Sequence, residues 1–141
     1  MKVAVIGSRE LWVEDLGRFL PGDTEELVSG GARGVDTCAR EYAKTHSLKL
    51  TEFLPEYERY GRSAPIRRNC LIIDYADLVL AFWDGQSQGT AFVIKKCREL
   101  GKPIRVYRAK QTRLHQLSLS EMLKETEDLR IDIDEEFFDQ E

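Results

Sequence analysis

The stretch that decides the fold is DLVLAFWDGQSQGT, residues 77–90. Its first half, residues 77–83, is a nearly continuous apolar run, which is typical of a strand buried on both faces of a sheet. A glycine-containing turn follows. Residues 90–100 then show helical spacing and end before Gly101 and Pro103, the residue types expected just past a helix. A buried strand, a turn and a helix in this order predict one unit of a parallel α/β sheet.

The same unit recurs along the chain. Apolar, β-branched runs predict further strands at residues 2–6, 26–29, 49–54 and 103–107. Apolar residues at helical spacing predict helices from Trp12 to Leu20, from Val35 to His46, and from Pro65 to Ala76, where Ile66, Cys70, Ile73 and Ala76 form the apolar face. We therefore expect an α/β fold, a Rossmann-like open parallel sheet of about five strands in the order 3-2-1-4-5 with helices on both faces.

Charge divides the chain into two parts. Residues 121–141 hold ten acidic and two basic side chains, whereas the preceding 120 residues carry a net charge of +4. We interpret residues 1–110 as a Rossmann-like domain and residues 111–141 as an acidic C-terminal extension. The extension either docks on the domain, reaches across a homodimer or is disordered. A mildly basic domain is compatible with a phosphate ligand, but this charge alone does not predict nucleic-acid binding.

Several classes of protein are disfavoured by composition. No apolar run reaches the roughly 18–20 residues that span a bilayer, and the apolar start of the chain is too short for a signal peptide. We expect a cytoplasmic protein without membrane association. The three cysteines lie far apart and the chain has two histidines, which disfavours a disulfide framework and a structural zinc site. No metal or other cofactor is predicted.

Three glycine-containing turns are the main functional signal, because a parallel sheet brings the carboxyl ends of its strands to one edge. They are residues 7–9 (GSR), residues 30–36 (GGARGVD) and residues 84–90 (DGQSQGT). Glycine lets backbone N–H groups approach an anion closely, a following helix adds the positive end of its dipole, and arginine adds paired donors. Such glycines can also serve only to turn the chain, and Ser or Thr only to cap a helix. Convergence of three turns favours a ligand site.

The predicted site combines these turns with the start of the third helix. Its residues are Gly7, Ser8, Arg9, Gly30, Gly31, Ala32, Arg33, Gly34, Asp36, Arg68, Asn69, Asp84, Ser87, Gly89 and Thr90. The glycines and Thr90 would cradle phosphate, and the arginines would neutralise it. Asp36 either accepts from a ribose hydroxyl or is only a partner of the helix dipole. Asp84 lines the site or only caps its turn. Tyr57 and Tyr60 either stack on a base or cover the edge of the core.

Three motifs in this order resemble the SLOG superfamily, which is named for the DNA-processing SMF/DprA proteins and the LOG phosphoribohydrolases. They are SGGARGVD at residues 29–36, PIRRN at residues 65–69 and ADLVLAFWDGQSQGT at residues 76–90. The chain is most similar to the YspA/YpsA-related branch of small stand-alone proteins, over about residues 2–108. The resemblance implies a Rossmann-like fold and a pocket for a nucleotide or a nucleotide-derived ligand, such as an ADP-ribose- or NAD-like molecule.

The sequence also departs from the enzymes of that superfamily. LOG hydrolases carry a motif resembling PGGxGTxxE whose glutamate serves N-glycosidic cleavage, but here Ala91, Phe92 and Val93 follow Gly89-Thr90. DprA proteins carry further domains and a basic DNA-binding surface, which we do not expect here. The leading hypothesis is therefore the sensing or carrying of a nucleotide-type small molecule, with no catalytic residue assigned. The alternatives are LOG-type hydrolysis, with Asp36 or Asp84 as acid or base, and single-stranded nucleic-acid binding of the DprA type.

Overall fold

The computed structural model describes residues 1–108, and the extension predicted for residues 111–141 lies outside them. The strands are β1 (Lys2–Gly7), β2 (Glu26–Ser29), β3 (Lys49–Glu52), β4 (Leu78–Trp83) and β5 (Ile104–Arg108). The α-helices are α1 (Val35–Thr45), α2 (Tyr57–Tyr60), α3 (Ala64–Tyr75) and α4 (Gln88–Leu100). Two 3₁₀ turns complete the described elements, η1 (Leu16–Phe19) and η2 (Gly61–Ser63).

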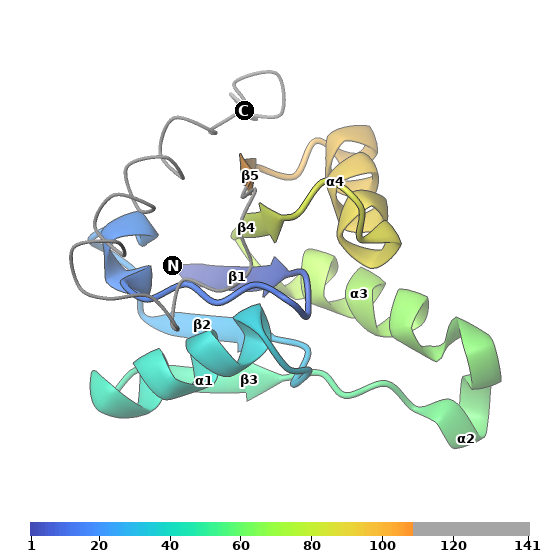
Figure 1. The fold of residues 1–141 in the computed structure, drawn as a ribbon, viewed down its shortest axis with the longest axis horizontal. Coiled ribbons are helices and arrows are strands. Elements are labelled where there is room, and N and C mark those ends of the chain that lie inside the picture. The colour runs from blue at the N-terminus through green and yellow to red at the C-terminus, as the bar shows by residue number, and fades with distance from the viewer. Residues whose placement is uncertain (109–141) are drawn as a thin grey trace.

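The strands form one parallel sheet in the order β3-β2-β1-β4-β5 (Figure 1). The predicted Rossmann-like α/β fold and its strand order are confirmed. The central strand β1 pairs with β2 on one side and β4 on the other, and its last residue, Gly7, lies opposite Phe82. The chain runs outward from β1 through β2 to β3 and then crosses to β4 and β5 on the other side of β1. The strand order therefore reverses between β1 and β4, and a crevice forms at the carboxyl ends of the strands at this point.

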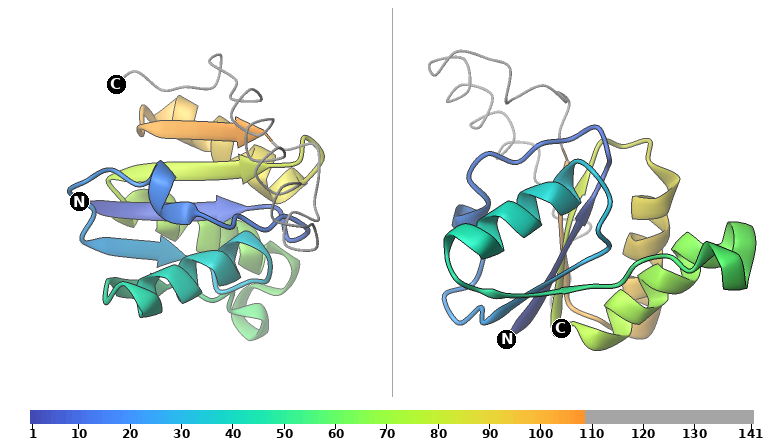
Figure 2. Two further views of the ribbon diagram at one scale, coloured as in Figure 1. Left: turned by 60° about the vertical axis from the view of Figure 1, so that its left-hand side comes forward. Right: turned by 90° about the horizontal axis from the view of Figure 1, so that it is seen from below.

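Helices cover both faces of the sheet (Figure 2). Val3 and Val5 of β1 point to the face covered by α1 and η1, while Ala4 and Ile6 point to the face covered by α3 and α4. This alternation follows from the two-residue period of a strand. Both faces are apolar, which explains the continuous hydrophobic runs in the central strands.

The helix predicted from Trp12 to Leu20 is wrong in extent, since only η1 forms there. Leu11 and Val13 are both buried although they are two residues apart, a spacing that suits an extended segment. Phe19 then packs against Phe82 and Tyr107, with ring centroids 5.1 and 4.8 Å away. Tertiary packing on the β4–β5 part of this face outweighs local helical spacing.

The third helix also differs from its prediction. The polar segment 56–64 contains α2 and η2, and α3 begins at Ala64. Ile66, expected on the apolar face, is 47% exposed, whereas Ala64, Arg68 and Ile72 are buried. These buried positions follow an i, i+4, i+8 series, so an arginine occupies a core-facing position of the helix. The third strand ends at Glu52, earlier than predicted, and His46 lies just past α1 with its side chain exposed.

Candidate functional site

A cavity of about 370 Å³ opens at the carboxyl edge of the sheet, between the turns after β1, β2 and β4 and the start of α3. We call it the carboxyl-edge pocket. Twelve of the predicted site residues line it: Gly7, Ser8, Arg9, Gly30, Ala32, Asp36, Arg68, Asn69, Asp84, Ser87, Gly89 and Thr90. The predicted convergence of three turns therefore matches the geometry. The predicted residues Gly31, Arg33 and Gly34 do not line the pocket.

Asp36 is the most informative residue of the pocket. It lies in the first turn of α1 and is only 6% exposed. Its Oδ2 accepts a hydrogen bond from the backbone N–H of Ala32 at 3.0 Å, but its Oδ1 is buried and has no hydrogen-bond partner among residues 1–108. Burial raises the pKa of this carboxyl group, against the opposing effects of the Ala32 and Gly30 backbone N–H groups and the Arg68 charge. Buried acceptors without a partner are rare, so we expect a water molecule or a ligand group to donate to this atom.

Arg68 brings a buried positive charge to the same pocket. Its Nη1 donates to the Gly30 carbonyl oxygen at 2.6 Å, and its Nε donates to Asn69 Oδ1 at 2.7 Å. Gly30 makes room for this arrangement, because a Cβ there would collide with the guanidinium group. Burial lowers the pKa of Arg68, which the negative charge of Asp36 opposes. An arginine nonetheless keeps its charge at neutral pH.

The neighbouring arginines are oriented differently. Arg67 is exposed and its guanidinium group lies 4.4 Å from the centre of the Tyr60 ring, so Arg68 is the member of the pair that reaches the pocket. Arg9 lines the pocket with an exposed side chain. Arg33 forms an exposed ion pair with Glu10 at 2.9 Å. The positive charges on the pocket wall therefore come from Arg9 and Arg68.

The turn between β4 and α4 is held by its own side chains. Asp84 Oδ1 accepts hydrogen bonds from the backbone N–H groups of Gln86 and Ser87, both at 2.8 Å. Burial alone would raise the pKa of Asp84, but these hydrogen bonds outweigh it and the pKa is lowered. Ser8 Oγ accepts from the Asp84 N–H at 3.2 Å and so links two of the turns. This geometry agrees with the interpretation of Asp84 as a turn cap.

The glycines of the site serve two different purposes. Gly34 has a φ of +75°, and a Cβ on it would collide with the backbone of Arg9, so the fold itself requires glycine there. Gly89 has no such constraint: a Cβ on it would meet nothing within 4 Å. It lies in the first turn of α4, where backbone N–H groups have no intrahelical acceptor. The missing side chain leaves that turn open toward the pocket.

Five lining residues were not predicted: Ile6, Glu10, Pro65, Ile72 and Val93. Val93 is informative, because it holds the position of the glutamate in the motif GTxxE, and its side chain is buried. It lies three residues after Thr90, which helical geometry places on the same face. That spacing is the sequence signal that could have identified it. Elsewhere in residues 1–108, no group of three or more potential metal ligands occurs, and no helix is long and apolar enough to cross a membrane.

Comparison with known proteins gives one relationship. The Gene 61 protein of Mycobacterium phage D29 is 32% identical over 84 residues, which cover 55% of this chain and 67% of the relative. The chain belongs to the family of the Gene 61 protein. No family model matches the chain, and no solved structure matches it significantly. The name of the relative states no substrate or activity, so an account of function must start from the carboxyl-edge pocket.

Proposed function

We propose that this protein binds a nucleotide or a nucleotide-derived small molecule in the carboxyl-edge pocket. The observation that carries the proposal is Asp36, a residue of the pocket wall whose buried Oδ1 has no hydrogen-bond partner among residues 1–108. A ligand hydroxyl or N–H group that donates to this atom would remove the cost of burying it unpaired. Ribose hydroxyls are donors of this kind. The resemblance of three sequence motifs to the SLOG superfamily supports the same ligand class.

An anionic group of the ligand would bind away from Asp36, because a carboxylate repels phosphate. The first turn of α4 suits it, since helix N-termini favour negative charge and Gly89 leaves this turn open. Ser87 and Thr90 add hydroxyl groups there, and Arg68 adds a positive charge to the pocket wall. The ligand would thus carry a neutral hydrogen-bond donor that faces Asp36 and an anionic group that faces the first turn of α4. A sugar phosphate has both groups. Nucleotides carry both groups.

Binding without cleavage is the activity we propose. LOG-type cleavage uses a glutamate at the position that Val93 holds here, and Val93 is apolar and buried. The Asp84 carboxylate already accepts two backbone hydrogen bonds within its own turn. Asp36 is the remaining candidate acid that the sequence suggested. Its role as an acceptor for a bound hydroxyl group explains its burial without a chemical step.

Thermal unfolding with a panel of ligands tests the proposal. We expect at least one of AMP, ADP, a cyclic nucleotide and ADP-ribose to raise the melting temperature at millimolar concentration, because a ligand at 100 times its Kd stabilises the native state by about 2.7 kcal/mol. Asp36→Asn should abolish that shift. Asp74→Asn, an exposed position on α3 outside the pocket, is the matched control and should retain it. No shift with any ligand, or an equal shift in both variants, would contradict the proposal.

Mass spectrometry of small molecules that copurify with the protein gives an independent test. We expect a nucleotide-type mass from the native chain and its loss from Asp36→Asn. A copurifying oligonucleotide, with binding that weakens steeply as salt concentration rises, would instead indicate nucleic-acid binding.

A further inference from the structure

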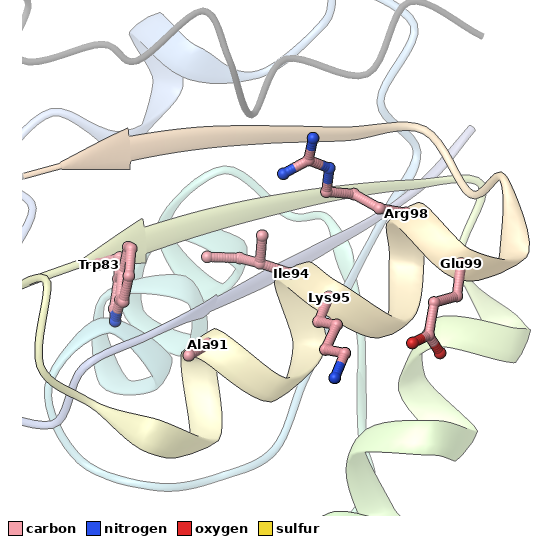
Figure 3. Close-up of a pocket in the computed structure, with 6 residues that line it drawn as sticks. All are labelled: Trp83, Ala91, Ile94, Lys95, Arg98 and Glu99. Carbon is pink, nitrogen blue, oxygen red and sulfur yellow. The ribbon is translucent and has the colours of Figure 1, made fainter.

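A second cavity, of about 480 Å³, lies on another side of α4 and shares no lining residue with the carboxyl-edge pocket. We call it the α4 groove. It is lined by Trp83, Ala91, Ile94, Lys95, Arg98 and Glu99 (Figure 3). Figure 3 shows these side chains along α4, with Trp83 at one end and Glu99 at the other. The lining is mainly apolar, with charged side chains beside it.

The aromatic end of the groove is held in place. Trp83 is the last residue of β4, and its indole Nε1 donates a hydrogen bond to the Ser87 carbonyl oxygen at 3.0 Å. The guanidinium group of Arg108 lies 5.5 Å from the centre of the Trp83 ring. A fixed tryptophan beside Ala91 and Ile94 offers a preformed surface for an apolar or aromatic side chain.

Basic side chains outnumber acidic ones at the groove. Lys95 and Arg98 line it and Arg108 lies over the Trp83 ring, whereas Glu99 is the one acidic residue among its lining residues. Charge complementarity therefore favours an acidic partner over a second copy of this basic surface. The apolar lining requires that partner to carry large hydrophobic side chains as well. A suitable occupant alternates or combines acids with aliphatic and aromatic residues.

The chain itself contains such a segment. Residues 131–138, IDIDEEFF, hold four acids together with two isoleucines and two phenylalanines. The described chain reaches Arg108, which contacts Trp83 at the end of the groove. Segment 109–130 has 22 residues, and a chain of that length spans at most roughly 70 Å, whereas a 13-residue helix such as α4 is about 20 Å long. The segment is therefore within reach of every part of the groove.

We propose that the α4 groove binds residues 131–138 of its own chain. Phe137 and Phe138 supply the apolar contact with Trp83 and Ile94, and the neighbouring acids face Lys95 and Arg98. Tethering favours this intramolecular contact over the same contact between two chains, because it raises the effective concentration of the segment into the millimolar range.

Zero-length amine–carboxyl cross-linking of the full chain, read by mass spectrometry, tests this pairing. We expect the acids within residues 132–136 to link to Lys95 more often than to Lys44, an exposed lysine on α1, which covers the opposite face of the sheet. The double substitution Phe137→Ser/Phe138→Ser leaves every charge in place and should reduce the Lys95 links to the level of Lys44. The matched control Leu117→Ser/Leu119→Ser, outside the segment, should leave them unchanged. A far-UV circular dichroism spectrum checks that each variant is folded.

Each other result would overturn the proposal. Absence of Lys95 links, or equal yields at Lys95 and Lys44, would mean that the segment does not bind the groove. Links that persist after the phenylalanine substitutions would reduce the contact to nonspecific charge attraction. Links between isotopically labelled and unlabelled chains in a mixture would assign the groove to the segment of a second copy.

Discussion

Two buried carboxylates lie at opposite ends of the sheet, and their surroundings differ. Glu26 begins β2, is 7% exposed and accepts hydrogen bonds from the hydroxyl groups of Thr51 and Tyr75, both at 2.6 Å. The Lys49 ammonium group lies 3.6 Å from its other oxygen. Asp36, at the carboxyl edge, is buried to the same degree, but one of its oxygens has no partner in the described chain.

The pKa values of the two groups move in opposite directions for this reason. Burial alone would raise the pKa of Glu26, but the hydroxyl donors and the charges of Lys49 and Lys2 outweigh burial, and the pKa is lowered. At Asp36 burial prevails and the pKa is raised. The buried carboxylate at the amino end of the sheet therefore has its partners within the chain, whereas one oxygen of the carboxylate at the carboxyl edge has no hydrogen-bond partner among residues 1–108.

Neutralising each carboxylate is the strongest test of this difference. Glu26→Gln should lower the free energy of unfolding by about 2 kcal/mol, because it removes charge-assisted hydrogen bonds and leaves lysines without their counter-charge. Asp36→Asn should change it by less than about 1 kcal/mol, since the amide oxygen can still accept from Ala32, and removal of a poorly satisfied charge offsets the loss of the negative charge beside Arg68. Urea denaturation at neutral pH measures both. Equal losses in the two variants would mean that both carboxylates are structural.

Substitutions of two glycines at the carboxyl edge separate the residues that the fold requires from those that leave room for a ligand. Gly34→Ala should destabilise the fold by about 2 kcal/mol, because its backbone conformation is almost restricted to glycine and a Cβ would collide with Arg9. Gly89→Ala should instead stabilise the free protein by up to about 1 kcal/mol, through the better helix propensity of alanine.

The same Gly89→Ala variant should bind the nucleotide identified by thermal shift more weakly, because the new Cβ occupies the opening at the α4 N-terminus. Isothermal titration calorimetry gives the affinity, and Gly101→Ala, at the other end of α4, is a control for the binding measurement. Unchanged affinity in Gly89→Ala would show that phosphate does not approach this turn.

Acid unfolding distinguishes the two carboxylates, because their pKa shifts have opposite directions and change the stability in opposite directions as the pH falls. The Glu26 pKa is below its ordinary value of 4.5, so its stabilisation is present above that value and is lost as the pH falls through the folded-state pKa. The Asp36 pKa is above its ordinary value of 3.8, so the cost of its buried charge is present above the folded-state pKa and disappears as the pH falls toward 3.8.

Between about pH 5 and pH 3, Glu26→Gln should therefore flatten the loss of stability, and Asp36→Asn should steepen it. Urea midpoints measured across this range, each relative to the native chain, test the prediction. A steeper loss in Glu26→Gln or a flatter loss in Asp36→Asn would reverse the assigned pKa directions.

The smallest expected effect concerns catalysis. Nucleoside 5′-monophosphates should survive prolonged incubation with the protein, because in the proposed resemblance to LOG hydrolases Val93 stands where those enzymes carry a glutamate, and Asp84 is held in its turn. Chromatography for free base measures this. Base release that disappears in Asp36→Asn would move Asp36 from a binding role to a catalytic one.

Most of the fold could be read from the sequence, because it rests on local patterns. Apolar runs marked the five strands, and Gly101 and Pro103 marked the end of α4, where Gly101 adopts a left-handed conformation. The turns at the carboxyl edge followed from the parallel order of the strands. Twelve of the proposed site residues line the pocket for the same topological reason.

The remaining features depend on contacts between distant residues. Helical spacing in residues 12–20 did not produce a helix of that length, because Phe19 is positioned by Phe82 and Tyr107. Arg33 pairs with Glu10 and does not line the pocket, whereas Arg9 does, and no local pattern indicates this difference. The burial of Arg68 likewise depends on the Gly30 carbonyl group, 38 residues away in the chain.

The sequence by itself determined the α/β class, the strand order and the edge where the turns meet, because strand and helix periods and glycine positions are local properties. Only the tertiary structure distinguished the glycines that the fold requires from Gly89, and the satisfied Glu26 from the unsatisfied Asp36. The physical reason is that hydrogen-bond satisfaction and steric room depend on which distant atoms are brought within a few ångströms of each group.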